Sequence, residues 1–292
     1  MSTYQYHLNV PNSYNNQTIR NYLSTYLLLP KHLIFSLRTH YRVTVNQKYL
    51  PMNFKIQTGD EVSLTFEDSD FTPNQPVIVD KSKPLNVIWE NDDFMIVNKV
   101  RGDKTHANQP GESHATLNYA AGYLAPNQPY IIHRLDQQTS GALIIAKTPA
   151  VVPILTRLIK DKTIKRTYLV WVHGTFKDAH GTIDLPIGRD LHDQRKRKIN
   201  GEKAQHAVTH YQVIKEVAGN SLLQVQLETG RTHQIRVHLA YLKHPIINDP
   251  LYDSTANLAQ PMLLHSWKVE MPTPFYHQLI TVTASLPPEM KK

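Results

Sequence analysis

A short charged turn between two apolar stretches constrains the fold of this chain more than any other feature. The segment reads IIHRLDQQTSGALIIAK at 131–147. Its apolar flanks have the length and composition of buried strands, so the turn lies where a core begins. Burying a charge is costly unless the charge is paired. Two explanations for Asp136 follow: it caps the turn or pairs with Arg134 as part of the fold, or it carries chemistry.

Strands with a few dispersed helices are expected from residue 85 onward. The expected helices are VVPILTRLIKD and QIRVHLAYLK. The expected strands are VIWE, FMIVNK, ALIIAK, TYLVWVHG, LLQVQLETG and LITVTASL. Because strands predominate and no segment repeats, the pattern predicts an α+β fold with a mixed, mostly antiparallel sheet.

The first 68 residues have the pattern of a separate small unit. Apolar residues at helical spacing predict one helix from Thr18 to about Leu29, ended by Pro30, and another from Lys31 to about Thr39. The short strands VTVN and EVSLTF follow. These elements predict a small α/β domain.

Residues 69–84 separate this unit from the remainder. They hold three prolines and no periodicity, which is typical of a linker. We therefore expect a small domain at 1–68, a linker at 69–84 and a large domain at 85–292. A linker of this kind would leave the small domain free to find its own binding site.

Charge and composition limit the partners and the chemistry. The formal net charge is +8, and the stretch from Lys160 to Lys203 holds eleven Lys and Arg against six Asp and Glu. This local excess is typical of a surface that binds phosphates, although a merely basic surface would have the same composition. The absence of cysteine excludes disulfides, thiolate metal sites and a cysteine nucleophile.

Nothing in the chain indicates a membrane partner or secretion. No apolar run approaches the ~18 residues that a membrane span needs. The amino-terminal MSTYQYHLNVPNSYNNQT is polar and lacks a signal-peptide pattern. We expect a soluble cytoplasmic protein and a monomer.

A second charged segment, ETGRTHQIRVHL at 228–239, holds Arg231 and Arg236 at the start of an expected helix. Either arginine alone is explained by a basic helix face. His233, His238 and His244 suggest a metal site, but no HExxH spacing is present, so no metal is expected.

Together these segments resemble the RluA-type pseudouridine synthase family. The family signature HRLD, two variable residues and TSG matches HRLDQQTSG at 133–141, and a second signature matches TGRTHQIRVH at 229–238. A tyrosine in a strand between them matches Tyr168. The resemblance covers about residues 85–292. The chain departs from the family at Val100-Arg101, Gln205-His206, Asn248 and Ser266, which weakens any transfer of substrate identity.

The resemblance implies an enzyme that isomerises uridine in structured RNA, ribosomal or transfer, without a cofactor. It makes Asp136 the nucleophile, Arg236 its partner in an ion pair, and Tyr168 the residue that stacks on the flipped uracil. It places Arg134 in the gap left by the base or at a phosphate. The other substrate-binding residues that it implies are His133, Leu135, Thr139, Arg231, His233, Gln234 and Ile235, and the basic run Arg195, Lys196, Arg197 and Lys198 is expected to bind backbone phosphates.

The amino-terminal segment VTVNQKYLPMNFKIQTGDEVSLTF at 43–66 is similar to the end of the alpha-L RNA-binding domain of ribosomal proteins. A structural cap without RNA contact is the alternative for this unit. For the whole chain, two alternatives to the enzyme remain. One is a catalytically inactive RNA-binding or ribosome-assembly factor on the same fold, and the other is a histidine-ligated metal hydrolase.

Overall fold

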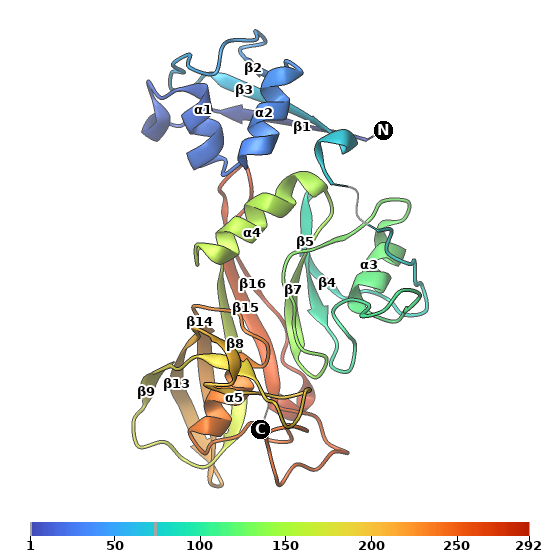
Figure 1. The fold of residues 1–292 in the computed structure, drawn as a ribbon, viewed down its shortest axis with the longest axis vertical. Helices are drawn as coiled ribbons and strands as arrows, with labels where there is room; N and C mark the ends of the chain where they lie inside the picture. Colours follow the sequence, from blue (N-terminus) through green and yellow to red (C-terminus); the bar gives the residue numbers. More distant parts are fainter. Residues whose placement is uncertain (1, 73–74, 292) are drawn as a thin grey trace.

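The computed structural model describes residues 2–72 and 75–291, which form two units packed end to end (Figure 1). We call residues 2–70 the N-terminal unit and residues 75–291 the large unit. Within the described residues, no helix has the length and apolar character required to span a bilayer.

The N-terminal unit is a three-stranded antiparallel sheet with helices packed against it. The strands β1 (Thr3–Asn9), β2 (Val43–Val45) and β3 (Glu61–Glu67) are ordered β1-β3-β2. The helices are α1 (Ile19–Asn21), continued by a π-helical turn (Tyr22–Tyr26), and α2 (Lys31–Thr39). Strand β1 was not predicted, although Tyr4, Tyr6 and Leu8 alternate along it toward the core.

The large unit is built on a ten-stranded sheet. Its main path is β4-β5-β7-β15-β8-β14-β13-β9, with β16 beside β15 and β6 beside β7. The β7–β15 pair is parallel, and the other ladders given for this sheet are antiparallel. A mixed, mostly antiparallel sheet with few helices confirms the predicted α+β class.

The bounds of these strands are β4 (Val87–Glu90), β5 (Phe94–Lys99), β6 (Tyr130–Ile131), β7 (Ser140–Ala146), β8 (Lys165–His173), β9 (His180–Asp184), β13 (Val208–Val217), β14 (Asn220–Leu227), β15 (Leu264–Pro272) and β16 (Leu279–Thr283). The helices are α3 (Thr116–Leu124), α4 (Val152–Lys160) and α5 (Gln234–Tyr241). A small separate sheet consists of β10 (Ile187–Arg189), β11 (Arg197–Ile199) and β12 (Glu202–Gln205).

The central strands bury both faces, and alternate residues belong to two different cores. Phe94 and Ile96 of β5 lie in a core that includes α4 and the N-terminal unit. Met95 and Val97 of the same strand lie in a core with α3, α5 and Tyr168. This alternation follows from the two-residue period of a strand. We refer to these two sides as the joint face and the site face.

The N-terminal unit shares the core of the joint face. The Tyr6 ring lies 3.9 Å, centroid to centroid, from that of Phe275, and its hydroxyl donates to Asp93 Oδ1 at 2.6 Å. Tyr26 stacks on His277 at 4.0 Å. Arg157 on α4 donates to the Ser24 carbonyl at 3.0 Å. The N-terminal unit is therefore docked on the large unit, and these contacts leave it without the freedom that a slack linker would give.

The described part of the expected linker is also held against the large unit. The backbone N–H of Asp80 donates to the Asn118 carbonyl at 3.2 Å, and the Asn118 amide donates to the Ile78 carbonyl at 2.9 Å. Gly122 of α3 leaves room for this crossing, because a Cβ there would lie 2.3 Å from the Asp80 oxygen. Pro73 and Asn74 of the expected linker lie outside the described residues.

Candidate active site

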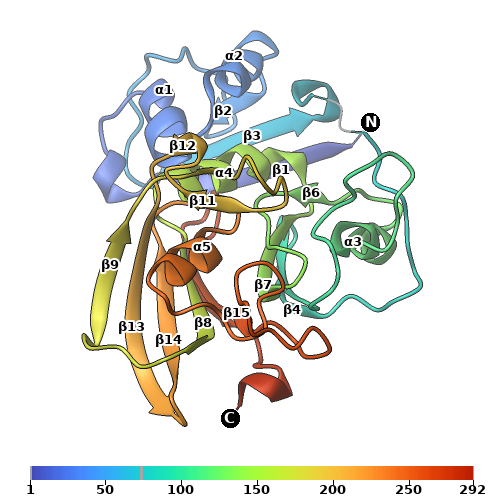
Figure 2. The ribbon, with the colours of Figure 1, turned by 60° about the horizontal axis from the view of Figure 1, so that its bottom comes forward.

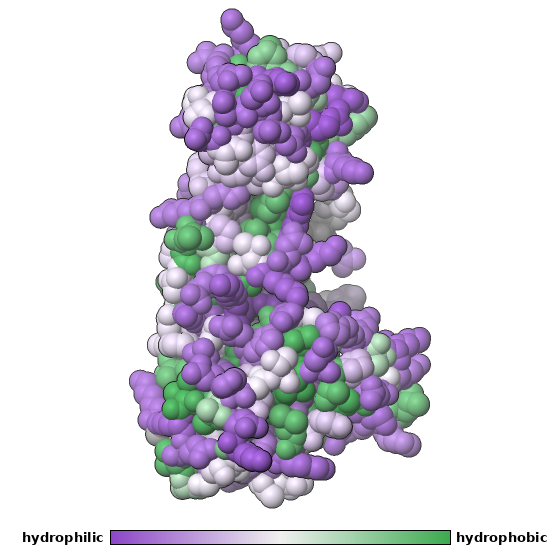
Figure 3. All heavy atoms as spheres, turned by 90° about the vertical axis from the view of Figure 1, so that its left-hand side faces the viewer, coloured by the Kyte–Doolittle hydropathy of each residue, from purple (hydrophilic) through white to green (hydrophobic). Residues whose placement is uncertain are grey.

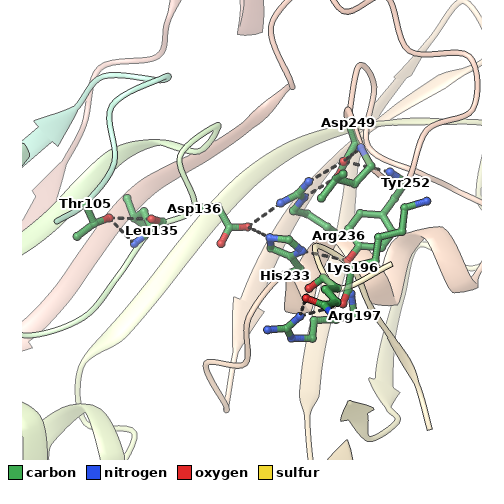
Figure 4. Close-up of polar contacts among 11 residues, drawn as sticks. Thr105, Leu135, Asp136, Lys196, Arg197, His233, Arg236, Asp249 and Tyr252 are labelled. Atoms are coloured by element: carbon green, nitrogen blue, oxygen red, sulfur yellow. Dashed lines mark hydrogen bonds and ion pairs between the residues drawn. The ribbon is translucent and has the colours of Figure 1, made fainter. Parts of the chain in front are cut away.

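Asp136 lies in the turn between β6 and β7, and backbone contacts fix that turn. The Thr105 hydroxyl donates to the Leu135 carbonyl at 2.7 Å and lies 3.1 Å from the Leu135 N–H (Figure 4). The Thr139 N–H donates to the Asp136 carbonyl at 3.0 Å. The Asp136 side chain is 27% exposed, so it faces a hollow.

The turn leads into the parallel seam between β7 and β15. Gly141 has φ +106°, and a Cβ at this position would lie 2.2 Å from the Ser266 carbonyl oxygen. Since L side chains disfavour this φ and have no room here, the seam requires glycine. Ser266 also pairs with Tyr168 of β8, so the seam places the turn and Tyr168 on neighbouring strands.

Arg236 joins the Asp136 carboxylate to a second one. Its Nη1 donates to Asp136 Oδ2 at 3.1 Å, while its Nε and Nη2 donate to both oxygens of Asp249 at 2.7 and 2.8 Å (Figure 4). Burial disfavours the charged guanidinium, but the bonds and charges of Asp249 and Asp136 outweigh it and raise the pKa of Arg236. This buried bidentate pair fixes the group that faces Asp136.

A hollow of about 610 Å³ opens between Asp136 and Tyr168. Tyr168 is buried on the site face of β8 and lines it. Five basic residues line it against two acidic ones, Asp136 and Glu228. The basic residues are Arg134, Lys160, Arg166, Arg231 and Arg236. A concave site with this lining suits an anionic ligand that carries a flat ring.

A second hollow, of about 500 Å³, meets the first at Asp136 and reaches the basic run. Arg195 lines it and pairs with Asp193 at 2.8 Å. Of the rest of the run, Lys196 and Arg197 contact Tyr252, and Lys198 is exposed on β11. Figure 2 shows β11 and β12 above α5.

Two of the predicted substrate-binding residues, His133 and Gln234, use side-chain polar atoms in hydrogen bonds within the fold. His133 Nε2 accepts the Ile144 N–H at 3.0 Å, and burial lowers the pKa of this imidazole to about 3. The Gln234 amide donates to the Val208 carbonyl at 2.9 Å, and its oxygen accepts the Thr229 hydroxyl at 2.7 Å. Leu135, Thr139 and Ile235 are buried in the wall of the first hollow. These contacts support a structural role for the side chains of His133 and Gln234.

The three histidines that suggested a metal site bond to separate parts of the protein. His238 contacts Thr209 and the Leu185 carbonyl, His244 contacts the His173 carbonyl, and His233 contacts Tyr252. No group of three or more potential metal ligands occurs within residues 2–72 and 75–291.

Three further residues at the site were not assigned from the sequence. Asp249 and Tyr252 belong to HPIINDPLY at 244–252, a segment that also resembles the RluA-type family, and this resemblance was the available signal. Lys99 ends β5, and its ammonium donates to the carbonyls of Val100, Asp103 and Gln137 at 3.0, 2.6 and 3.2 Å. Burial lowers the pKa of Lys99 to about 8. Lys99 thus holds the backbone carbonyl of Gln137, the residue that follows Asp136.

Comparison with known proteins identifies the family. The family described as RNA pseudouridylate synthase matches residues 93–241, and the RluD ribosomal pseudouridine synthase N-terminal domain matches residues 6–62. An uncharacterized RNA pseudouridine synthase, YhcT of Bacillus subtilis, is 34% identical over 283 residues, covering 95% of this chain and 92% of the relative. Ribosomal large subunit pseudouridine synthase D of Nitrosomonas europaea is 36% identical over 223 residues, covering 71% and 63%.

Solved structures agree with the sequence relatives. Human RNA Pseudouridylate Synthase Domain Containing 1 superimposes with a TM-score of 0.61 at 25% identity, over 71% of this chain and 86% of the human chain. The human protein, the two families and the relatives are all named for pseudouridine or pseudouridylate synthases or for a domain of one. This chain therefore belongs to the RluA-type family of RNA pseudouridine synthases, which are isomerases.

Proposed function

We propose that this chain converts specific uridines of ribosomal RNA to pseudouridine, with Asp136 as the nucleophile. The observation that carries the proposal is the Asp136 carboxylate held at 3.1 Å by a buried arginine, where two hollows with basic walls meet. The names of relatives that act on the ribosomal large subunit support ribosomal RNA as the substrate and the cytoplasm as the location.

The reaction needs one carboxylate and a way to hold the loose base. The bond from uracil N1 to ribose C1′ breaks, a bond from C5 to C1′ forms, the C5 proton leaves and N1 gains a proton. Asp136 has three routes: attack at C1′, removal of the C2′ proton to give a glycal, or attack at C6 of the base. The Arg236 guanidinium holds the attacking carboxylate in place at the start of each route.

Tyr168 and Arg134 complete the site. The buried Tyr168 ring can stack on the flipped uracil, and its hydroxyl can take part in removing the C5 proton. Arg134 is exposed and borders both hollows, a position suited to filling the gap in the RNA stack or to contacting a phosphate. Flipping costs a few kcal/mol, which these contacts offset.

The N-terminal unit supplies a second RNA surface in this proposal. Arg20, Lys31, His32, Phe35 and Arg38 line one hollow of the unit. Phe35 is 59% exposed, and the Arg38 guanidinium lies 5.0 Å from its ring centroid. Exposed aromatic rings flanked by cations are typical of sites that stack unpaired bases. Figure 3 shows hydrophilic side chains over most of this unit on the face in view.

The test uses purified protein and large-subunit ribosomal RNA that lacks modifications. Wild type is expected to form pseudouridine at defined positions, and Asp136→Asn to bind the RNA while losing turnover by about a thousandfold or more. Mapping pseudouridines in cells with and without the gene identifies the positions. If the mapped pseudouridines lie in transfer RNA alone, the substrate is transfer RNA and not ribosomal RNA. Equal activity of Asp136→Asn and wild type would refute the nucleophile.

An inactive RNA-binding factor is the competing function. It predicts RNA binding without conversion by wild type under any RNA concentration. The same assay therefore separates the two functions.

A further inference from the structure

Tyr252 connects the basic run to the catalytic carboxylate. It lies in the turn after α5, where its backbone N–H donates to Asp249 Oδ1 at 3.2 Å. Asp249 is the residue that holds Arg236. The ring lies 5.2 Å from the Arg236 guanidinium and 6.0 Å from the Lys196 ammonium. One side chain thus touches both the ion pair at the nucleophile and the basic run.

The Tyr252 hydroxyl makes two contacts, which together define where it donates its own hydrogen bond. It accepts the backbone N–H of Arg197 at 2.8 Å and lies 3.0 Å from His233 Nδ1 (Figure 4). Burial raises the pKa of Tyr252 to about 12, so the hydroxyl keeps its proton. Because the Arg197 contact uses an oxygen lone pair, that proton is free to be donated to His233 Nδ1.

This hydrogen bond sets the proton position on His233. Burial lowers the pKa of His233, which keeps the ring neutral near pH 7. A neutral ring that accepts at Nδ1 carries its proton on Nε2. Nε2 lies 3.9 Å from Asp136 Oδ2, too far for a hydrogen bond but close enough for an attractive dipole.

The small sheet that carries the basic run is packed on the same helix as these residues. Ile187 of β10 and Val237 of α5 share a small apolar cluster, against which Ile199 of β11 and Tyr252 pack. Movement of β11 is therefore transmitted to Tyr252 through both its ring and its hydroxyl. Binding energy from remote contacts raises a chemical rate only when it acts on the reacting groups.

We propose that Tyr252 is a positioning residue that couples RNA backbone held by Lys196 and Arg197 to the orientation of His233 and Arg236 at Asp136. The inference rests on the proposed function and assigns the basic run a part in the chemical step. An RNA that lacks the phosphates contacted by the basic run would then still bind, but it would be converted slowly. The run would act on the rate as well as on affinity.

The test is Tyr252→Phe, which removes the hydroxyl and keeps the ring. Tritium release from RNA labelled at uridine C5 is measured in single turnover at saturating RNA. We expect the rate to fall roughly tenfold or more with little change in Kd, since the hydroxyl contacts the protein and acts through His233. The matched control is Tyr241→Phe on exposed α5 surface, which is expected to leave the rate unchanged.

A double-variant cycle separates coupling from simple damage. Lys196→Ala alone is expected to lower the saturating rate, but in the Tyr252→Phe background it should change only affinity. Additive effects on the rate would overturn the proposal. Nitrogen NMR of His233 gives a second readout, because Tyr252→Phe should shift the proton population from Nε2 toward Nδ1. An unchanged tautomer would also overturn it.

Failure of this inference differs from failure of the proposed function. If wild type converts uridine and Tyr252→Phe does so at the same rate, only the coupling is wrong. If wild type does not convert uridine in any ribosomal or transfer RNA, the function itself is wrong.

Discussion

The two faces of the central sheet use opposite means to hold their elements. The joint face is closed by apolar and aromatic contacts that unite the N-terminal unit, α4 and the strands in one core. The site face ends in a network of charged side chains around Asp136, Arg236 and Asp249. On the proposed function, we expect removal of a side chain from the first face to change mainly stability, and removal of one from the second to change the reaction rate as well.

The largest expected effect is that of Arg236→Ala, which breaks the charged network. It leaves Asp249 buried and unpaired and removes the counter-charge of Asp136. Breaking such a buried pair costs about 3–5 kcal/mol of stability, and turnover should fall by orders of magnitude. Denaturant unfolding and single-turnover assays check both.

Arg236→Lys is the matched control, because it keeps the charge but not the geometry that bridges two carboxylates. It should recover more stability than activity. Full activity of Arg236→Lys would contradict a role for the bridge.

Tyr6→Phe tests the joint face. It removes the hydroxyl that donates to the buried Asp93 carboxylate and keeps the ring against Phe275. We expect a loss of about 1–3 kcal/mol in the free energy of unfolding, with unchanged turnover of the folded protein. Tyr4→Phe removes an exposed hydroxyl that bonds to Asp68 and should cost much less. A fall in turnover from Tyr6→Phe alone would show that the two faces are not independent.

His133 belongs to the motif HRLD at 133–136 but is expected to behave as part of the fold. Burial holds its pKa at about 3, below the ordinary 6.5, with Arg166 contributing in the same direction. The unfolded chain therefore binds a proton that the folded chain does not, and stability contributed by the neutral ring is lost as pH falls from about 6.5 toward 3.

Urea unfolding at several pH values measures this slope. His133→Gln should reduce it by up to about 1 kcal/mol per pH unit, because a glutamine takes up no proton when the chain unfolds. His7→Gln, at an exposed residue of β1, should leave it nearly unchanged. Equal slopes for His133→Gln and wild type would refute the structural interpretation.

An effect on RNA binding alone is expected at the proposed RNA surface of the N-terminal unit. Phe35→Ala removes a stacking ring and should weaken binding of full-length ribosomal RNA by roughly tenfold, which corresponds to about 1–3 kcal/mol. Arg38→Ala should also lower the salt dependence of log Kd by about one. Leu279→Ala, an exposed apolar residue on β16, serves as the control. Unchanged affinity would make the unit a structural cap.

The sequence predicted what depends on neighbours along the chain. The strand that became β5, the helix α2 and the turn before β7 all follow from local periodicity. Asp136 and Arg236 were paired through motifs, although 100 residues separate them. The motifs did not include the second carboxylate, Asp249, and periodicity says nothing about which distant side chains meet.

The contact between the N-terminal unit and the large unit could not be predicted from the sequence, for a physical reason. Tyr6 and Asp93 are 87 positions apart, and local patterns do not tell which distant side chains meet. Prolines between the units indicate absence of regular structure, but they do not say whether the segment is slack. The packed side chains of Tyr6, Tyr26 and Phe275 are among the contacts that join the units.

Because the N-terminal unit is docked, the distance between the two proposed RNA surfaces is fixed. A tethered unit could reach RNA elements at many separations, whereas a fixed one holds Phe35 and Asp136 at a constant spacing. On the proposed function, an RNA that occupies both surfaces must present an unpaired base and a target uridine at that spacing. Inserting base pairs between the two elements of a substrate should therefore lower conversion stepwise, and selection of the uridine would depend on distance along the RNA as well as on its sequence.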